Sequence, residues 1–268
     1  MQRKRHHALW FSVLAIVCVV QGATAADWYD PGWRFRIPVT VQPNPVGTTL
    51  SGFPLLLEFT QADSELWTRA QPGGRDLLFT AADGTTRLPG EVERLDCAAQ
   101  RLLAWVRIPT LSGTAPTNLF LYFGNPVCGS QTDTNLWDAG HVAVYHLGER
   151  ARDGDADFAE STGKGSPAMP LNFEDNGPGS TDAAGAVGGG VMFGGDDDYL
   201  VAPHSDSLNV TNHITVSFWF RPQGTNINLD LLNHRTPDGT WGHGYVGSWS
   251  KDGRLLAILG DEPYRSFA

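Results

Sequence analysis

The sequence predicts an all-β protein with two β-sandwich domains. Its 268 residues include 31 Gly, 17 Pro and 10% aromatic side chains, a composition typical of many short strands joined by turns. Several segments alternate apolar and polar residues, which is the period of a β-strand. A helical period is confined to 63–69, where we expect a single turn. With 41% hydrophobic and 18% charged residues, the chain is expected to fold around a core.

The first 25 residues have the features of a signal peptide. Three basic residues at 3–5 precede an apolar run at 8–20, and Ala23-Thr24-Ala25 offers the small side chains that a signal peptidase requires. A membrane anchor is the alternative, but the run is shorter than the roughly 20 residues that span a bilayer. We therefore expect a secreted or periplasmic protein of the cell envelope, with no membrane insertion after signal cleavage.

The chain is strongly acidic, with 19 Lys and Arg against 29 Asp and Glu. Residues 1–26 hold three of the basic residues and no acidic residue, so removal of the leader changes the net charge from −10 to −13. Such a surface repels nucleic acid and anionic lipid, and neither is an expected partner.

The first domain is expected at residues 27–138. Apolar residues at every second position of 35–41 predict its first strand, and Asp83-Gly84 is a strong turn dipeptide. Further strands are predicted at 53–59, 76–80, 102–108 and 118–123. This spacing, with turn residues between the strands, predicts a small antiparallel sandwich.

The second domain is expected at residues 139–268. Residues 148–190 are rich in Gly, Ser, Asp and Pro, which predicts a long loop, or two loops around a weak strand at 169–173. In the strand predicted at 214–220, four apolar side chains share one face. Other strands are predicted at 142–147, 190–193, 199–201, 244–249 and 254–259. This is fewer than a two-sheet jelly roll needs, so we expect an incomplete domain.

The first domain resembles a known bacterial family. The segments 31–36 (PGWRFR), 74–80 (GRDLLFT), 104–109 (AWVRIP) and 121–125 (LYFGN) follow one another as in the domain of unknown function 2341. The resemblance covers roughly residues 30–128. The family has no defined biochemical role, so the resemblance implies no particular activity.

The second domain resembles the N-terminal part of a laminin-G-like, concanavalin A-type jelly roll over residues 140–262. The resemblance rests on 144–149 (VYHLGE), the Gly- and Asp-rich stretch 188–200 and 214–220 (ITVSFWF). The later strands of that family, with their Trp-His-His element, are absent, which implies a C-terminally truncated concanavalin A-like jelly roll. Proteins with this pair of domains are typically exported, and in some relatives the pair precedes a TolQ/ExbB-type proton-channel segment.

The sequence shows no catalytic pair of acids, and we expect the protein not to be an enzyme. Concanavalin-type glycosidases place two carboxylates on one strand face. The nearest stretch here, from Glu91 to Asp96, has the wrong order and lies in the first domain, so we interpret it as an exposed strand edge with solvated charges. His146 lies in an apolar strand and is expected to be a satisfied buried histidine and not a ligand.

Calcium is the expected cofactor. Asp196, Asp197 and Asp198 are adjacent carboxylates that repel one another and favour a bound cation. Calcium accepts oxygen ligands in flexible geometry. The alternative is a turn that caps the following strand and keeps its charges in solvent.

Cys97 and Cys128 are the cysteines that follow the leader. In an oxidising compartment we expect them to form a disulfide, and closing a loop of this size would constrain the unfolded chain by roughly 3–4 kcal/mol. Two separate buried thiols are the alternative.

The ligand-binding candidates are Trp241, Asp238 and His243. Trp241 shares strand parity with Tyr245 and Trp249, and exposed Trp rings stack on the C–H faces of sugars. The alternative is that these rings fill the core. Near the start of the mature chain, Trp28, Tyr29 and Trp33 are expected to form a clasp over the first domain.

These features favour a non-catalytic module that binds a glycan or glycoconjugate. One alternative is a periplasmic interaction module whose partner is a cell-envelope protein of a TolQ/ExbB-type transporter. The other is a fragment of a glycoside hydrolase whose acids lie outside these 268 residues.

Overall fold

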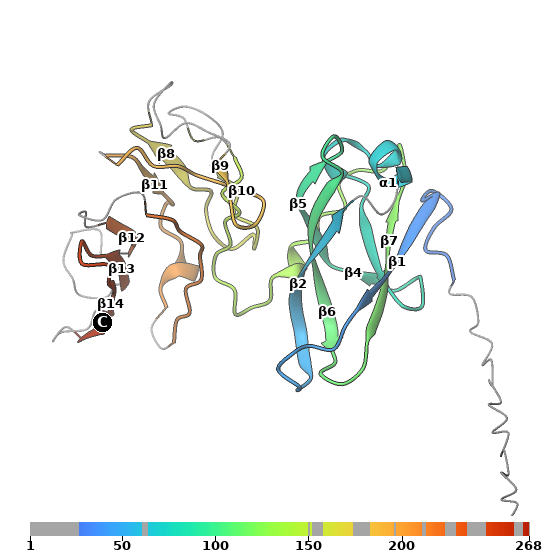
Figure 1. Cartoon of the computed structure of the whole chain (residues 1–268), viewed down its shortest axis with the longest axis horizontal. Coiled ribbons are helices and arrows are strands. Elements are labelled where there is room, and N and C mark those ends of the chain that lie inside the picture. The colour runs from blue at the N-terminus through green and yellow to red at the C-terminus, as the bar shows by residue number, and fades with distance from the viewer. Residues whose placement is uncertain are drawn as a thin grey trace, which may run out of the picture. The chain divides into compact units, whose positions relative to one another are not determined.

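The structure is a computed structural model that describes residues 27–60, 64–149, 151, 158–173, 183–195, 197–210, 213–222, 229–234, 245–259 and 265–267. The predicted signal peptide at 1–25 lies outside this range. The described residues form antiparallel strands and one α-helix, α1 (Ser64–Arg69), so the all-β fold class is confirmed (Figure 1). No helix in the described residues is long and apolar enough to cross a membrane.

Two antiparallel sheets form a β-sandwich within residues 35–123. One sheet has the order β1 (Phe35–Val41), β7 (Thr117–Phe123), β3 (Leu78–Ala81) and β4 (Arg87–Leu88). The other has the order β2 (Leu50–Thr60), β6 (Arg101–Leu111) and β5 (Gly90–Asp96). Figure 1 shows these strands in the part of the chain that runs from blue to green. The predicted antiparallel sandwich is therefore present.

The core of the sandwich follows the alternation of its longest strands. Every second residue of a strand points to the same face, and seven core residues of β6 and β7 follow this period. They are Leu102, Ala104, Val106 and Ile108 on β6, and Leu119, Leu121 and Phe123 on β7. Leu66 and Trp67 of α1 pack against the same cluster.

A tryptophan clasp ties the first described residues to the sandwich, as the sequence predicts. Trp33 is buried, and its indole Nε1 donates a hydrogen bond to the carbonyl of Asp76 at 2.7 Å. Trp28 Nε1 in turn donates to the Trp33 carbonyl at 2.8 Å. Tyr29 contacts Trp33 edge to face, with ring centroids 5.4 Å apart. These contacts anchor the chain immediately after the predicted cleavage site.

The predicted Asp83-Gly84 turn supports this clasp. Gly84 has φ of +81°, a conformation that favours glycine. A Cβ atom at this position would collide with the backbone oxygen of Asp27. The Gly84 carbonyl accepts a hydrogen bond from the Tyr122 hydroxyl at 2.9 Å, so the turn and the clasp fit together only with glycine here.

Residues 139–210 form small sheets around a second, smaller core. β8 (Met169–Leu171) pairs with β11 (Tyr199–Val201), and β9 (Ala183–Ala184) pairs with β10 (Gly189–Gly190). The buried residues of this second core are Ala151, Phe158, Ala168 and Phe173.

The structure also contains three short 3-10 helices. They are η1 (Pro72–Gly74), η2 (Thr134–Leu136) and η3 (Asp206–Leu208).

By internal contacts the chain divides into two compact units, Met1–Thr211 and Asn212–Ala268. Residues 139–210 thus share a unit with the sandwich. The predicted domain limits, 27–138 and 139–268, differ from this division and remain predictions.

The second unit contains a four-stranded antiparallel sheet. Its order is β12 (Leu229–His234), β13 (Tyr245–Trp249), β14 (Leu255–Leu259) and β15 (Arg265–Phe267). β13 and β14 form the predicted hairpin, and the turn is closed by the Gly253 amide donating to the Ser250 carbonyl at 2.9 Å. The prediction of a strand at 214–220 is wrong: residues 213–222 have no strand assignment and pair with no described strand.

Candidate functional site

A cluster of acidic and aromatic side chains lies on the outer face of the β2–β6–β5 sheet. Glu91 and Glu93 are two residues apart on β5, and both carboxylates reach His146. The register of β5 against β6 shifts between Val92 and Arg94, so Glu93 lies at a β-bulge. Val92 lies between them and packs into the sandwich core instead. Trp105 of β6 is the direct partner of Glu91 in the antiparallel register. The sheet thus presents two carboxylates beside an indole ring.

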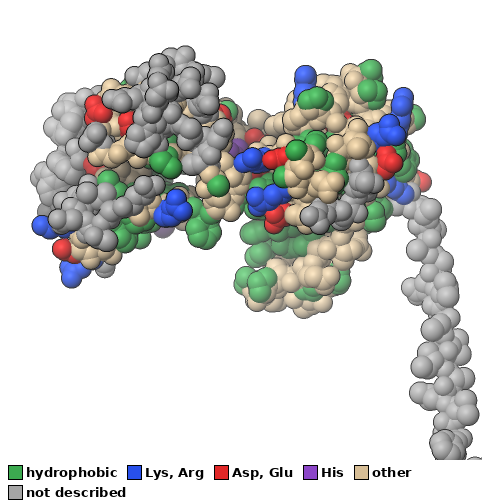
Figure 2. Space-filling model, turned by 45° about the horizontal axis from the view of Figure 1, so that its top comes forward, with side chains coloured by type: hydrophobic (Ala, Val, Ile, Leu, Met, Phe, Trp, Pro, Cys, Tyr) green, Lys and Arg blue, Asp and Glu red, His purple; other side chains and the backbone are tan. Residues whose placement is uncertain are grey.

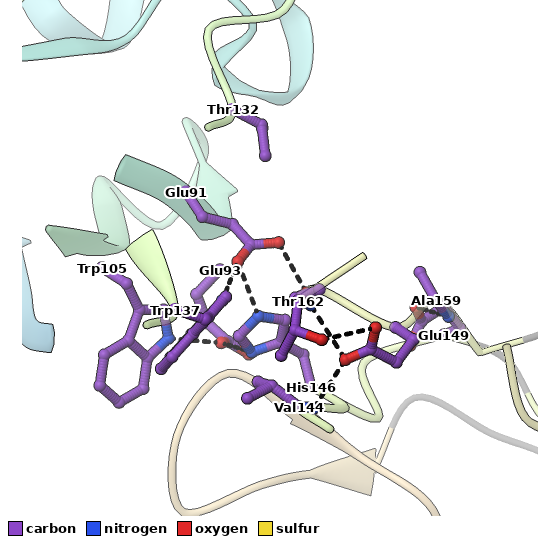
Figure 3. Close-up of polar contacts among 12 residues, drawn as sticks. Glu91, Glu93, Trp105, Thr132, Trp137, Val144, His146, Glu149, Ala159 and Thr162 are labelled. Atoms are coloured by element: carbon purple, nitrogen blue, oxygen red, sulfur yellow. Dashed lines mark hydrogen bonds and ion pairs between the residues drawn. The ribbon is translucent and has the colours of Figure 1, made fainter. Parts of the chain in front are cut away.

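Side chains from later segments approach this face. Trp137, which follows η2, lies with its ring centroid 5.6 Å from that of Trp105. His146 lies between the two glutamates, with its ring 6.2 Å from that of Trp137. Figure 3 shows both carboxylates pointing to the imidazole, with the two Trp rings beside it.

Hydrogen bonds and ion pairs connect the members of the cluster. Glu93 Oε2 lies 2.5 Å from His146 Nδ1 and accepts a hydrogen bond from Trp105 Nε1 at 2.9 Å. Glu91 Oε2 lies 3.3 Å from His146 Nε2, at ion-pair distance but outside hydrogen-bond geometry. The same oxygen accepts from Trp137 Nε1 at 3.1 Å, and Oε1 accepts from the Ser161 hydroxyl at 2.8 Å. The imidazole is therefore held on both sides by carboxylates.

Burial makes these charges interdependent. The side chains of Glu93, Glu91 and His146 are 3%, 15% and 18% exposed. Burial lowers the pKa of His146, but the close carboxylates of Glu91 and Glu93 outweigh it and raise that pKa to about 10. Burial raises the pKa of Glu91, but His146, Ser161 and Trp137 outweigh it and bring that pKa below its ordinary value. At neutral pH the cluster holds an imidazolium and at least one carboxylate.

This charge state decides what the cluster can do chemically. A general base needs a free basic nitrogen, whereas each nitrogen of His146 faces a carboxylate oxygen. A general acid of the glycosidase type needs a carboxyl group with a raised pKa, and that of Glu91 is lowered. The arrangement is an ion cluster in which each imidazole nitrogen faces a carboxylate.

Two local features of the backbone bring the partners together. Leu147 has φ of +56°, a left-handed conformation that is rare for a residue with a Cβ atom. Gly188, with φ of +63°, is buried and lies so close to Glu93 that a Cβ atom would collide with its carboxylate. Glycine at position 188 thus permits the close approach of this backbone to Glu93.

The sequence-based interpretation of this region is partly wrong. Glu91 and Glu93 were expected to be solvated, and they are largely buried, because residues that follow the sandwich cover the outer face of the sheet. Arg94 and Asp96, further along β5, are more exposed, as expected of a solvated strand edge, and form a surface ion pair at 3.6 Å. His146 was expected to be a satisfied buried histidine; it is largely buried and pairs with carboxylates, but its Nε2 makes no hydrogen bond within the described residues.

The predicted ligand-binding residues Trp241, Asp238 and His243 lie outside the described residues. Of the predicted calcium ligands, Asp196 also lies outside, Asp197 is exposed and Asp198 is half-buried. Asp198 Oδ2 accepts a hydrogen bond from the backbone amide of Gly194, as in the alternative in which this run caps a turn. In the part of the chain that the structure describes, no group of three or more His, Cys, Asp or Glu residues is arranged to hold a metal ion.

The predicted disulfide between Cys97 and Cys128 is not formed in the structure, where both are free thiols. Cys97 lies in the exposed turn between β5 and β6. Cys128 follows β7 of the other sheet and packs against Trp33 and Tyr122. Burial raises the pKa of the Cys128 thiol. The two thiols therefore belong to different sheets and different environments.

The second unit presents an exposed aromatic segment at residues 216–220. Trp219 is 81% exposed, and Val216 and Phe218 are each about half exposed. Phe220 contacts Trp249 of β13 edge to face at 5.4 Å and lies 5.8 Å from Phe218. Sequence reasoning expected these residues to belong to a paired strand and did not predict their exposure.

Comparison with known proteins gives one match. Residues 73–142 match the model of a family described as a domain of unknown function, DUF2341. No curated protein and no solved structure matches the chain. The matched segment contains Glu91, Glu93, Trp105 and Trp137, and it ends four residues before His146. The predicted resemblance of the first domain to this family is thereby supported over residues 73–142.

Proposed function

We propose that the protein is an exported, non-catalytic module that binds a glycan or glycoconjugate. The observation that carries this proposal is the 81% exposure of Trp219 within the apolar segment 216–220. A contiguous exposed apolar surface is costly in water and marks an interaction site. Indole rings offer a flat apolar face of the kind on which sugar rings stack.

The distribution of charge favours stacking over charge recognition. The chain carries a net charge of −10, which disfavours polyanionic ligands. On the face of the molecule shown in Figure 2, basic and acidic side chains lie next to one another with hydrophobic side chains between them. A neutral glycan is the ligand class that suits such a surface.

The finer assignments belong to the same proposal. The signal-peptide features of residues 1–25 support export to the periplasm or the cell surface. The resemblance of 144–149, 188–200 and 214–220 supports a laminin-G-like, concanavalin A-type origin for the second domain. Trp241, Asp238 and His243 are proposed to extend the binding surface, and Asp196 to Asp198 to bind calcium. The mutual pairing of Glu91, Glu93 and His146 supports a module without catalysis.

A glycan array with the mature protein tests this proposal. Wild type should bind defined glycans, and Trp219→Ala should lose at least about tenfold in affinity, since stacked aromatic anchors dominate such interfaces. Val127→Ala is the matched control, because Val127 is 89% exposed and lies outside the aromatic segment. Parallel arrays with Trp241→Ala, and with calcium or a chelator, test the other assignments. Equal binding by wild type and Trp219→Ala would remove the proposed platform.

A cell-envelope protein is the second candidate partner. The favouring observation is that residues 213–222 pair with no described strand, so their backbone can accept a strand from another protein. Wild-type protein coupled to resin and incubated with solubilised envelope would then retain a protein whose capture survives digestion of glycans. Loss of capture after that digestion would favour the glycan.

A further inference from the structure

His146 lies between two hydrophobic cores. Its neighbours Tyr145 and Leu147 pack against the second core around Phe158, while its own ring contacts Glu91 and Glu93 on the sandwich. The apolar side chains of Tyr145 and Leu147 thus point to one side of the segment and the imidazole of His146 points to the other. His146 therefore connects the two cores, which belong to one compact unit, through its ion pairs.

The two glutamates depend on this cation. Glu93 is 3% exposed, and a carboxylate at that depth requires a partner of opposite charge or enough hydrogen bonds to replace water. Among the ion pairs of the described residues, His146 is the cation that reaches Glu91 and Glu93. The close backbone of Gly188 excludes solvent from the same carboxylate.

A second link strengthens the first. The Ser161 hydroxyl donates to Glu91 at 2.8 Å, and the Ser161 amide donates to the Val144 carbonyl at 2.9 Å. Tyr145 forms an isolated antiparallel bridge with Glu160. The segments around 145 and 161 are therefore joined to each other and reach Glu91 together.

We propose that Glu91, Glu93 and His146 form a latch that fastens residues 141–149 and 158–173 to the sandwich. The folded unit that contains the matched segment 73–142 then extends at least to Phe173 and is incomplete without His146. The outer face of β5 is an intramolecular docking surface whose partner is the segment that follows it. This inference is independent of the proposed function.

Hydrogen exchange on the full mature chain tests the latch. In His146→Ala we expect amide exchange within 141–149 and 158–173 to accelerate by at least about tenfold, while β6 and β7 keep their protection. His141→Ala is the matched control: this neighbouring histidine pairs with Asp138 at 2.8 Å on a more exposed surface and should change exchange little. Unchanged exchange in His146→Ala, or an equal change in His141→Ala, would overturn the proposal.

Two further measurements extend the test, and the first remains decisive if His146→Ala does not fold. Ser161→Ala removes one hydrogen bond from Glu91 and should accelerate exchange locally at 158–165. Glu91→Gln combined with Glu93→Gln removes the buried charges, so adding His146→Ala to this pair should have a smaller effect than in wild type. If His146→Ala accelerated amide exchange equally in wild type and in the Gln pair, the residues would not act as a latch. The same conclusion would follow if Ser161→Ala left exchange at 158–165 unchanged.

Discussion

Glu93 is an acidic residue whose side chain is 3% exposed and whose carboxylate contacts Trp105 and His146. Removing one partner of a buried ion pair costs roughly 3–5 kcal/mol, because the other charge stays buried. An exposed pair is worth only about 0–1 kcal/mol. The two classes of ion pair in this protein should therefore respond very differently to mutation.

We expect Glu93→Ala to lower the free energy of unfolding by roughly 3–5 kcal/mol. Glu58→Ala is the control, since Glu58 pairs with Arg101 at 2.7 Å while both side chains are about half exposed, and it should cost at most about 1 kcal/mol. Urea denaturation followed by Trp fluorescence measures both. Equal losses in the two variants would contradict the burial of the Glu93 charge.

The same residues predict how stability depends on pH. Because the His146 pKa is raised from 6.5 to about 10, its contribution is complete below pH 6.5 and is lost as the pH rises through 10. The Glu91 pKa is lowered from 4.5, so its contribution is present above pH 4.5 and is lost as the pH falls through the lowered value.

Thermal unfolding from pH 5 to 10.5 checks the alkaline arm of this profile. The stability of wild type should fall towards pH 10 more steeply than that of His146→Gln, which lacks the titrating ring. Parallel profiles for the two proteins would show that His146 is not a raised-pKa cation.

At the scale of elements, the alternation of β7 determines which of its residues are essential. Leu121 is fully buried in the sandwich core, and truncation of such a residue costs about 2–5 kcal/mol. We expect Leu121→Ala to lose this amount of unfolding free energy. Val127→Ala, at a site that is 89% exposed, should change it by less than about 0.5 kcal/mol. A small loss in Leu121→Ala would mean that the sheets do not pack through this face.

The strands of the first domain were predictable because their patterns are local. Alternation over 102–108 and 118–123 identifies β6 and β7, since the faces of a strand are set by its own period. The same reasoning could not predict that Glu91 and Glu93 are covered. An antiparallel sheet normally keeps one face in water, and the segment that covers this face begins more than 40 residues later in the chain.

At 214–220, in contrast, the sequence predicted a strand that the structure does not contain. The apolar periodicity of this segment is that of a strand, but a strand forms only where a neighbour supplies hydrogen bonds, and no described strand lies beside it. β12 (Leu229–His234) was missed because its six residues, LDLLNH, do not alternate strictly. A Glu-x-Glu pair opposite a Trp was the available signal for the candidate site.

At the scale of the whole molecule, the described residues pack around two cores, and the structure joins Cys97 and Cys128 by no disulfide. Cys97 and Cys128 are free thiols in the structure. We therefore expect dithiothreitol to leave the melting temperature of the mature protein unchanged. A melting temperature that falls by several degrees in the reductant would show that a disulfide contributes after all, since about 3 kcal/mol corresponds to such a shift.

We propose that the protein recognises a glycan without transforming it. The most direct test of this proposal is to incubate mature wild type and Trp219→Ala with the glycan selected on the array, measuring retention and, by mass spectrometry, the sugar products. We predict retention by wild type, at least about tenfold weaker retention by Trp219→Ala, and no change in the mass of the glycan. Release of shorter sugars, or equal retention by both proteins, would contradict the account.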